Sequence, residues 1–451
     1  MLSHRPRPWA SHYPRRSPRN TRHRIRGENQ THRRTVGVTP INATFRCRAY
    51  PDDDTASEAW HHIELHRQIR NHAIRDYYNH EPVDRPSPYD QHNSLTDWKQ
   101  RWPVFKEVSA HAAQQTVSQS HKDIKNLREK QDKGYNVGRL KWQGSGERRS
   151  VTYQSEGYDV DYNTGQDGYA TLRLSKIGTI PIRVHCDLPP TEEISRVVLK
   201  KETTGEWFAC LVHEKPDDDL PETSKIEDLS ATDRVGGDLG IQSYIHTSDN
   251  LAVDTLDLSD EYDRYAREQR KLDRKEHGSN NWEKQRQKVA KAKRRIKRKV
   301  LDYQHKLTTW LVREYDMVAV EDLDVKPMLE TSQSAKNNQD AAWSRFLTLL
   351  EYKAELHGTH VVKVEPAGTT KECSRCGVET DKPIWVREHS CPACGHEEDR
   401  DLNAAKNILS CGRTQLGAGR SELPPVQTAL PVFTPSRVDA KRVVEAGSPE
   451  A

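Results

Sequence analysis

Hydrophobic spacing divides the first half of the chain into a helical part and a β part. Apolar residues recur every three or four positions over 59–78 and again over 104–128, which predicts helices after a short strand at 44–50. From 169 to 214 apolar and polar residues alternate, which predicts short strands, the last two joined in a hairpin at Thr204 and Gly205. We therefore expect a small helical unit and a compact β unit, which we interpret as a barrel.

The pattern after residue 233 has a different order. Three strands are predicted within RVGGDLGIQSYIHTSDNLAVDTLDL, followed by a long helical region at 258–315. A strand at 317–323, a helix at 343–356 and a strand at 360–366 follow. The helical region has one apolar face, formed by Val289, Ile296, Val300, Tyr303, Leu307 and Leu311. Three strands in a meander, then two strands alternating with helices, predict an α/β sheet of the ribonuclease H type.

The composition favours an ordered centre with polar extensions. The chain has 451 residues, of which 33% are hydrophobic and 31% are charged, a length sufficient for two or three domains. Its longest apolar runs cover only a few residues, so no segment is expected to span a bilayer. Four of the eight cysteines are scattered, unlike a secreted disulfide framework, and this favours a reducing compartment.

Both ends of the chain lack hydrophobic periodicity. Ten arginines but only one acid, Glu28, lie between Arg5 and Arg34. One interpretation is that this stretch is a disordered tail, or that the start of the open reading frame has been placed too far upstream. The other is that it is an electrostatic arm that binds a polyanion. The segment 412–451 is rich in Pro, Gly and Ser and is expected to be a disordered tail.

A dense run of positive charge occupies the long helical region. Ten cations and one acid lie between Asn281 and Val300. Such a run is expected to follow a phosphate backbone without reading its sequence, whereas the alternative is a solvated amphipathic helix. The candidate nucleic-acid-binding residues are Lys284, Arg286, Lys288, Lys291, Lys293, Arg294, Arg295, Lys297, Arg298 and Lys299.

Four cysteines form two C-x-x-C pairs. Cys373 and Cys376 are separated by fourteen residues from Cys391 and Cys394, and a glycine follows each pair. Two such pairs can close a tetrahedron of thiolates around one zinc ion. Because four thiolates leave no open coordination position, this zinc is expected to be structural. The neighbouring His396 is expected to lie on the surface.

Three acidic residues stand at the ends of predicted elements that neighbour one another. Asp238 ends the first strand of the second half, Glu321 ends MVAVE, and Asp401 opens the last helix. Converging carboxylates can hold a pair of divalent metal ions that clamp the attacking and leaving oxygens of a phosphodiester. A single acid at the end of a strand or at the start of a helix is usually solvated or caps the helix, so it is the combination of three that indicates a metal site. Asp399 is expected to be a helix cap or an outer residue.

These motifs, in this order, resemble the TnpB (OrfB) proteins of insertion sequences, which are related to type V CRISPR effectors. The matching stretches are RVGGDLGI, DYQHKLTTWLVREYDMVAVEDL, WSRFLTLLEYKAELHGTHVVKVEPAGTTKECSRCG and CPACGHEEDRDLNAAKNIL. The resemblance is strong over 230–410 and loose over 41–225. It implies catalytic roles for Asp238, Glu321 and Asp401, zinc ligation by the four cysteines, and two catalytic Mg²⁺ ions.

The same resemblance implies the fold and its domains. The fold would be an α/β RuvC-like (RNase H fold) nuclease domain with an inserted zinc ribbon, plus an N-terminal β-barrel (wedge) with an inserted helical bundle. The expected boundaries are 1–40 for the basic arm, 41–225 for the wedge with its helical insertion at about 52–140, 230–366 for the nuclease domain, 367–398 for the zinc ribbon, 399–411 for the closing helix and 412–451 for the tail.

The function implied is that of a transposon-encoded RNA-guided DNA endonuclease. Its partners would be a guide RNA from the transposon end and a double-stranded DNA target, with no membrane, and we expect a cytoplasmic protein that associates with the nucleoid when bound to DNA. Two alternatives stay open: a nuclease-inactive guided DNA-binding regulator, and an accessory transposase without guided cutting. The three acids argue against the first.

Overall fold

The computed structural model describes residues 41–163, 167–215, 220–323, 342–366, 368–383, 386–417 and 436–438. The chain divides into two units, Met1–Thr39 and Pro40–Ala451, and all described residues belong to the second. The predicted arm at 1–40 and most of the predicted tail therefore lie outside the described residues. Within these ranges no helix is long and apolar enough to cross a membrane.

The first half forms a seven-stranded antiparallel sheet. Its strands are β1 (Ile41–Ala49), β2 (Ser150–Gln154), β3 (Tyr158–Asp161), β4 (Tyr169–Leu174), β5 (Gly178–Arg183), β6 (Ile194–Lys201) and β7 (Trp207–Lys215), in the order β2-β6-β7-β1-β5-β4-β3. The predicted hairpin is confirmed, since β6 pairs with β7 and Gly205 has a positive φ of 85° in the turn.

This sheet is curled until its two edges nearly meet. The edge strands β2 and β3 are consecutive in the sequence, and only residues 155–157 join them. In a flat sheet, six strand spacings would hold these edges about 29 Å apart. The link from Gln154 to Tyr158 spans at most about 14 Å, so the sheet must curl into a nearly closed barrel.

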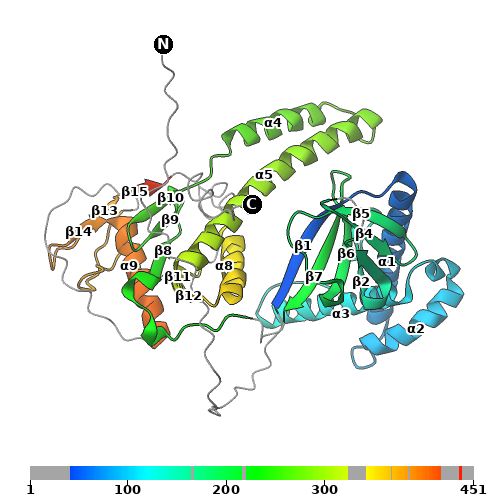
Figure 1. Cartoon of the computed structure of the whole chain (residues 1–451), viewed down its shortest axis with the longest axis horizontal. Helices are drawn as coiled ribbons and strands as arrows, with labels where there is room; N and C mark the ends of the chain where they lie inside the picture. Colours follow the sequence, from blue (N-terminus) through cyan, green and yellow to red (C-terminus); the bar gives the residue numbers. More distant parts are fainter. Residues whose placement is uncertain are drawn as a thin grey trace. The chain divides into compact units, whose positions relative to one another are not determined.

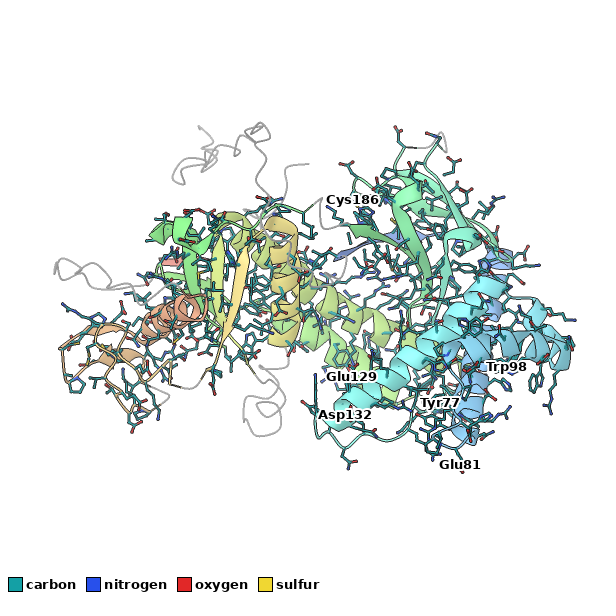
Figure 2. All side chains as sticks on the ribbon, turned by 90° about the horizontal axis from the view of Figure 1, so that it is seen from below. Tyr77, Glu81, Trp98, Glu129, Asp132 and Cys186 are labelled. Carbon is teal, nitrogen blue, oxygen red and sulfur yellow. The ribbon has the colours of Figure 1, made fainter. Side chains whose placement is uncertain are left out.

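Three helices stand between β1 and β2 in the sequence. They are α1 (Asp53–Asn79), α2 (Pro88–Arg101) and α3 (Ala110–Asp132), with a short 3-10 turn at Pro103–Lys106. Asp52 caps α1 by accepting a hydrogen bond from the Thr55 amide at 2.7 Å. Tyr77 of α1 and Trp98 of α2, both buried, are labelled in Figure 2 within this helical group.

The second half is built on a six-stranded sheet. Its strands are β8 (Arg234–Asp238), β9 (Ser243–Thr247), β10 (Leu251–Asp254), β11 (Met317–Glu321), β12 (His360–Val364) and β15 (Ser436–Val438), in the order β12-β11-β8-β9-β10-β15. The strand β9 runs antiparallel to both β8 and β10, whereas β11 is parallel to both β8 and β12. The meander, followed by two strands that alternate with helices, is the order that the hydrophobic pattern predicted.

Helices cover both faces of this sheet (Figure 1). They are α5 (Asn280–Glu314), α8 (Trp343–His357) and α9 (Arg400–Gln415), while α4 (Ser259–Asp273) packs on α5. One face packs on α5 and α8 through side chains such as Val235, Ile245 and Val318. The other packs on α9 through Met317, Ala319 and Ile408. Side chains alternate between faces along each strand, so this division decides which residues meet α9.

The hydrophobic pattern missed several elements. The strands β2 and β3, whose sequences SVTYQ and YDVD are short and partly polar, were not predicted, and neither was α2. The helical region at 258–315 is broken into α4 and α5 around Gly278, which has a positive φ of 83°. The predicted tail begins too early, because α9 continues to Gln415 and β15 pairs with β10.

Candidate active site and metal centres

The three predicted acids meet on the face of the sheet that α9 covers. In β11, Met317 and Ala319 contact α9, and Glu321 continues this alternation. In β8, Gly236 lies against α9, which places Asp238 on the same side two residues later. Asp401 stands in the first turn of α9. The structure therefore brings Asp238, Glu321 and Asp401 together from three elements.

Gly236 permits this meeting because it lets α9 touch the backbone of β8. A Cβ atom at Gly236 would lie 2.1 Å from the Ala405 carbonyl oxygen and 2.7 Å from the Leu409 amide nitrogen. Any larger residue would push the helix away from the strand. Close helix packing at position 236 thus sets how near the first turn of α9 comes to Asp238.

The acids influence one another electrostatically. Burial, and then the negative charges of Glu321 and Asp401, raise the pKa of Asp238 well above its usual range. Burial also raises the pKa of Glu321, although Thr369 Oγ1 donates a 2.6 Å hydrogen bond to this carboxylate. Burial raises the pKa of Asp401, and the Arg387 guanidinium opposes that rise. A divalent cation would relieve this crowding of negative charge.

The acids beside these three have other partners. Asp399 is the N-cap of α9, as expected: its Oδ1 accepts hydrogen bonds from the Asp401 and Leu402 amides at 2.8 and 3.1 Å. Asp322 is exposed and pairs with Lys363 at 3.8 Å. Arg387 forms an ion pair with the Oδ2 atom of Asp401.

The four predicted cysteines gather into one cluster. The Sγ atoms of Cys373 and Cys394 are 3.8 Å apart, and those of Cys376 and Cys391 are 3.5 Å apart. Sulfur atoms about 2.3 Å from one tetrahedral zinc ion would be about 3.8 Å apart, so the cluster has the size to hold a metal ion. His396 is not in the cluster and lies 3.4 Å from Glu398.

The two C-x-x-C pairs have the same backbone geometry. The Gly377 amide donates to the Cys373 carbonyl at 2.8 Å, and the Gly395 amide donates to the Cys391 carbonyl at 2.9 Å. Both glycines have positive φ, 75° and 67°, which favours glycine at the turn. Backbone amides, that of Cys394 first, lower the pKa of the Cys391 thiol to about 6, whereas burial raises the pKa of the Cys373 thiol.

Two asparagines attach the cysteine segment to α9. The buried Asn403 donates to the Glu372 carbonyl at 2.7 Å and accepts from the Ser374 amide at 2.8 Å. One turn later, Asn407 donates to the carbonyls of Thr369 and Glu372 at 2.9 and 2.8 Å. Because Thr369 also donates a hydrogen bond to Glu321, one chain of hydrogen bonds joins Glu321 to the segment of the first cysteine pair.

The predicted basic run lies on α5. Its apolar face is confirmed: Ile296, Val300, Tyr303, Leu307 and Leu311 are buried, and Val289 is half-buried. Most of the predicted cations are exposed, namely Lys284, Lys288, Lys291, Lys293, Arg295, Lys297, Arg298 and Lys299. A surface hollow is lined by Lys291, Arg294, Arg295, Arg298 and Lys299.

Some of these cations are already neutralised. Arg286 pairs with Glu283, and both Arg295 and Lys299 pair with Glu261 of α4. Arg294 is half-buried and pairs with Glu202 and Glu206 in the turn between β6 and β7. The exposed lysines of α5 are therefore better placed than Arg294 to meet a phosphate backbone.

Sequence reasoning missed four residues that touch the acids or their supports: His246, Thr369, Arg387 and Asn403. The signal for Asn403 and Asn407 was present, since their spacing of four places them on one helix face. The position of His246 depends on strand pairing, which places its Cα opposite that of Asp238.

Two family models match the chain. One, described as "Cas12f1-like, TNB domain", matches residues 343–408, which hold α8, the four cysteines and Asp401. The other, described as "Probable transposase" (OrfB_IS605), matches residues 212–332, which hold Asp238, the basic run and Glu321. The two matches together cover all three acids.

Relatives match over most of the chain. A protein of Streptomyces pristinaespiralis named "Putative RNA-guided DNA endonuclease" is 32% identical over 389 residues, which are 84% of this chain and 91% of that protein. A protein of Escherichia coli K12 named "Putative RNA-guided DNA endonuclease InsQ" is 26% identical over 78% of this chain and 88% of that protein.

A solved structure has a similar fold. The structure titled "Structure of the mini-RNA-guided endonuclease CRISPR-Cas_phi3" matches with a TM-score of 0.51 and 10% identity, over 85% of this chain and 93% of that chain. Because the identity is only 10%, this match is evidence for the fold alone. The fold of this chain is thus similar to that of the protein in this structure.

Proposed function

Because the chain belongs to the TnpB (OrfB) family of insertion-sequence proteins, we propose that it is an RNA-guided DNA endonuclease. The observation that carries the proposal is the meeting of Asp238, Glu321 and Asp401 on one face of the sheet, with raised pKa values. A protein that only bound DNA would not need three carboxylates crowded on one face of the sheet, since bringing like charges together away from water costs free energy.

The three acids fit a divalent metal site. Their ligand atoms are carboxylate oxygens, which Mg²⁺ prefers, and their mutual repulsion favours a bound cation. When bound, two Mg²⁺ ions would stabilise the attacking and leaving oxygens of a phosphodiester. The protein positions these acids in three ways. Thr369 holds Glu321 by a hydrogen bond, and the first turn of α9 carries Asp401. Gly236 lets α9 pack close to β8, which brings Asp401 near Asp238.

We assign the second half to a RuvC-like nuclease domain and the cysteine cluster to a zinc ribbon. The sheet order and the placement of the acids support the first assignment. The distances between the Sγ atoms and the matching backbone turns of the two C-x-x-C pairs support a structural zinc ion in the cysteine cluster. On this assignment the ribbon braces α9 and hence Asp401, through Asn403 and Asn407.

The proposed partners are a guide RNA from the transposon end and a DNA target. Base pairing with the guide would read the target sequence, while the protein would grip backbones. The exposed lysines of α5 and the hollow beside them supply positive charge for that grip.

Bound RNA tests the guided part of the proposal. The protein is expressed with its native downstream flank, purified at high salt, and the RNA that stays bound is sequenced. A discrete RNA that ends in sequence outside the element supports guidance. If no specific RNA is retained, guidance is refuted, and the acid site would then belong to an unguided nuclease.

Salt dependence tests the basic run. The double variant Lys291→Ala/Lys297→Ala removes two exposed lysines that make no ion pair among the described residues. The affinity for duplex DNA falls as the salt concentration rises. In the double variant, the magnitude of the slope of log affinity against log salt should be smaller by about 2, roughly one for each lost phosphate contact. Lys306→Ala is the control, because Lys306 already pairs with Asp302 at 3.1 Å. An unchanged slope in the double variant would mean that this part of α5 does not contact the DNA backbone.

A further inference from the structure

His246 lies beside the acid site, although the proposed nuclease chemistry does not use it. In β9 its Cα is paired with that of Asp238, and neighbours paired across strands share a face. Its strand neighbour Ile245 packs on the α5 side of the sheet, so His246 is on the α9 side. The residue is buried, with 3% of its surface exposed.

The imidazole of His246 points at the first turn of α9. Its Nδ1 atom lies 3.7 Å from Asp399 Oδ1, which is longer than a hydrogen bond. Its Nε2 atom is 3.5 Å from Asn250 Oδ1, at the limit of a weak hydrogen bond. Among the described residues, the imidazole thus makes two long contacts, and the one at Nδ1 is to a carboxylate, which is the placement of a metal ligand.

One ligand atom from each of His246, Asp399 and Asp401 lies within 4.8 Å of the others. Two ligand atoms that are each about 2.1 Å from one ion lie about 3 Å apart at a right angle and about 4.2 Å apart on opposite sides. The cluster therefore needs only a small contraction to share an ion.

We infer that His246, Asp399 and Asp401 form a binding position for a divalent transition-metal ion, beside the site that Asp238 and Glu321 complete. Mg²⁺ and Ca²⁺ take oxygen ligands, whereas imidazole suits the later first-row metals and tolerates Mn²⁺. The imidazole therefore makes this position more favourable to Mn²⁺, relative to Mg²⁺, than a set of carboxylates alone.

The capping role of Asp399 is compatible with this position. Its Oδ1 atom accepts the two amide hydrogen bonds of the α9 cap, and a carboxylate has a second oxygen for an ion. Arg387 pairs with Asp401 Oδ2 and would compete with the ion for that atom. The alternative is that His246 only stabilises the cap, in which case it would touch no metal.

This inference rests on the proposed function in that Asp401 is shared with the proposed nuclease centre. Its test does not depend on that function, because Mn²⁺ binding requires neither guide RNA nor target DNA. A protein without guided cleavage could still bind Mn²⁺ through His246, and a guided nuclease could lack this position.

The experiment is Mn²⁺ titration of the full chain, kept loaded with zinc and freed of other divalent ions. Pulsed electron paramagnetic resonance detects the modulation from an imidazole nitrogen bound to Mn²⁺. The wild type should show this modulation, and His246→Gln should lose it. His111→Gln is the matched control, because His111 is half-exposed on α3 and pairs with Glu156.

A second variant separates metal binding from helix capping. Asp399→Asn keeps an oxygen that can cap α9 but removes the negative charge. It should bind Mn²⁺ about 10-fold more weakly or worse, with an unchanged melting temperature. If the wild type shows no nitrogen modulation, if His246→Gln retains it, or if Asp399→Asn binds Mn²⁺ as the wild type does, the inference is wrong. Should His246→Gln fail to fold, the wild-type spectrum and Asp399→Asn still decide.

Discussion

The cysteine cluster and the acid site contrast in how the chain assembles them. All four cysteines lie within 22 residues, from Cys373 to Cys394, and local turns direct their thiols toward one point. The acids come from β8, β11 and α9, and residues 238 and 401 meet only through strand pairing and helix packing. The first site is a property of a short segment, whereas the second is a property of the whole sheet.

This difference shows where each site is vulnerable. The cluster should fail when a ligand is lost but tolerate small shifts in the sheet. The acid site should fail when any packing contact that places α9 is changed, even if all three acids remain. Asn403 and Asn407 are where the two sites meet, since they bond the cysteine segment from the helix that carries Asp401.

The largest effect is expected from Asp401→Ala. Loss of a metal-binding carboxylate removes several kcal/mol of transition-state stabilisation, and about 4 kcal/mol corresponds to about 10³-fold in rate. Plasmid cleavage in Mg²⁺ should fall by this factor, while RNA binding stays. Asp399→Asn, which keeps the cap, should cut within a few-fold of wild type. The opposite ranking of the two variants would reverse the assignment of these acids.

Cys373→Ser should break the cluster and spare the sheet. Zinc measured by elemental analysis should fall from about one ion per chain to nearly none, because one thiolate of a tetrahedral site is lost. The melting temperature should drop by several degrees. Cys411→Ser is the control, since Cys411 is exposed and outside the cluster. Unchanged zinc in Cys373→Ser would refute the metal centre.

Gly236→Ala should have the opposite effect to Cys373→Ser: it should displace α9 from the sheet but leave the zinc content unchanged. The added methyl group collides with the Ala405 carbonyl, and overpacking of this kind costs about 1–3 kcal/mol. Chemical denaturation should show this loss, together with reduced cleavage. Gly138→Ala is the control, because a Cβ there meets nothing within 4 Å. Wild-type stability in Gly236→Ala would mean that α9 does not need this close approach.

The smallest predicted effect is a pH dependence that only the acid site should show. Raised pKa values mean that the folded, metal-free site holds protons more tightly than the unfolded chain. This contribution to stability is present below the ordinary carboxyl pKa of about 4 and is lost as pH rises through the raised values. Mg²⁺ binds the deprotonated acids, so it should raise the melting temperature more at about pH 8 than at about pH 5.

The control for this pH effect is Asp238→Asn, which removes the acid whose pKa is raised well above the usual range. The variant should gain less from Mg²⁺ and with a flatter pH profile. An equal gain from Mg²⁺ at both pH values in the wild type would contradict the electrostatic account of the site.

Local sequence patterns predicted the parts that depend on local geometry. The C-x-x-C spacing indicated the thiol cluster, and the short apolar run in MVAVE indicated β11 and its terminal Glu321. The family motifs pointed to Asp238 and Asp401, and the structure brings both to Glu321. Asp399 was predicted as a cap and is one.

The parts that were missed depend on pairing between distant segments. His246 gains its position from the register between β8 and β9, which the sequence of β9, SYIHT, does not reveal by itself. The strands β2 and β3 are short and partly polar, and they pair as the two edges of the curled sheet. Gly236 looks like one of many glycines until α9 is placed against it. Tertiary contacts, and not local propensity, decide these features.

The most direct test of the central claim is guided cleavage by the protein with its co-purified RNA. Plasmids with and without a sequence that matches the guide are incubated with the wild type and with Asp238→Asn in Mg²⁺. We predict that the wild type cuts only the matching plasmid and that Asp238→Asn retains the RNA but does not cut. Cleavage that ignores the match, or cleavage by Asp238→Asn at the wild-type rate, would contradict the account.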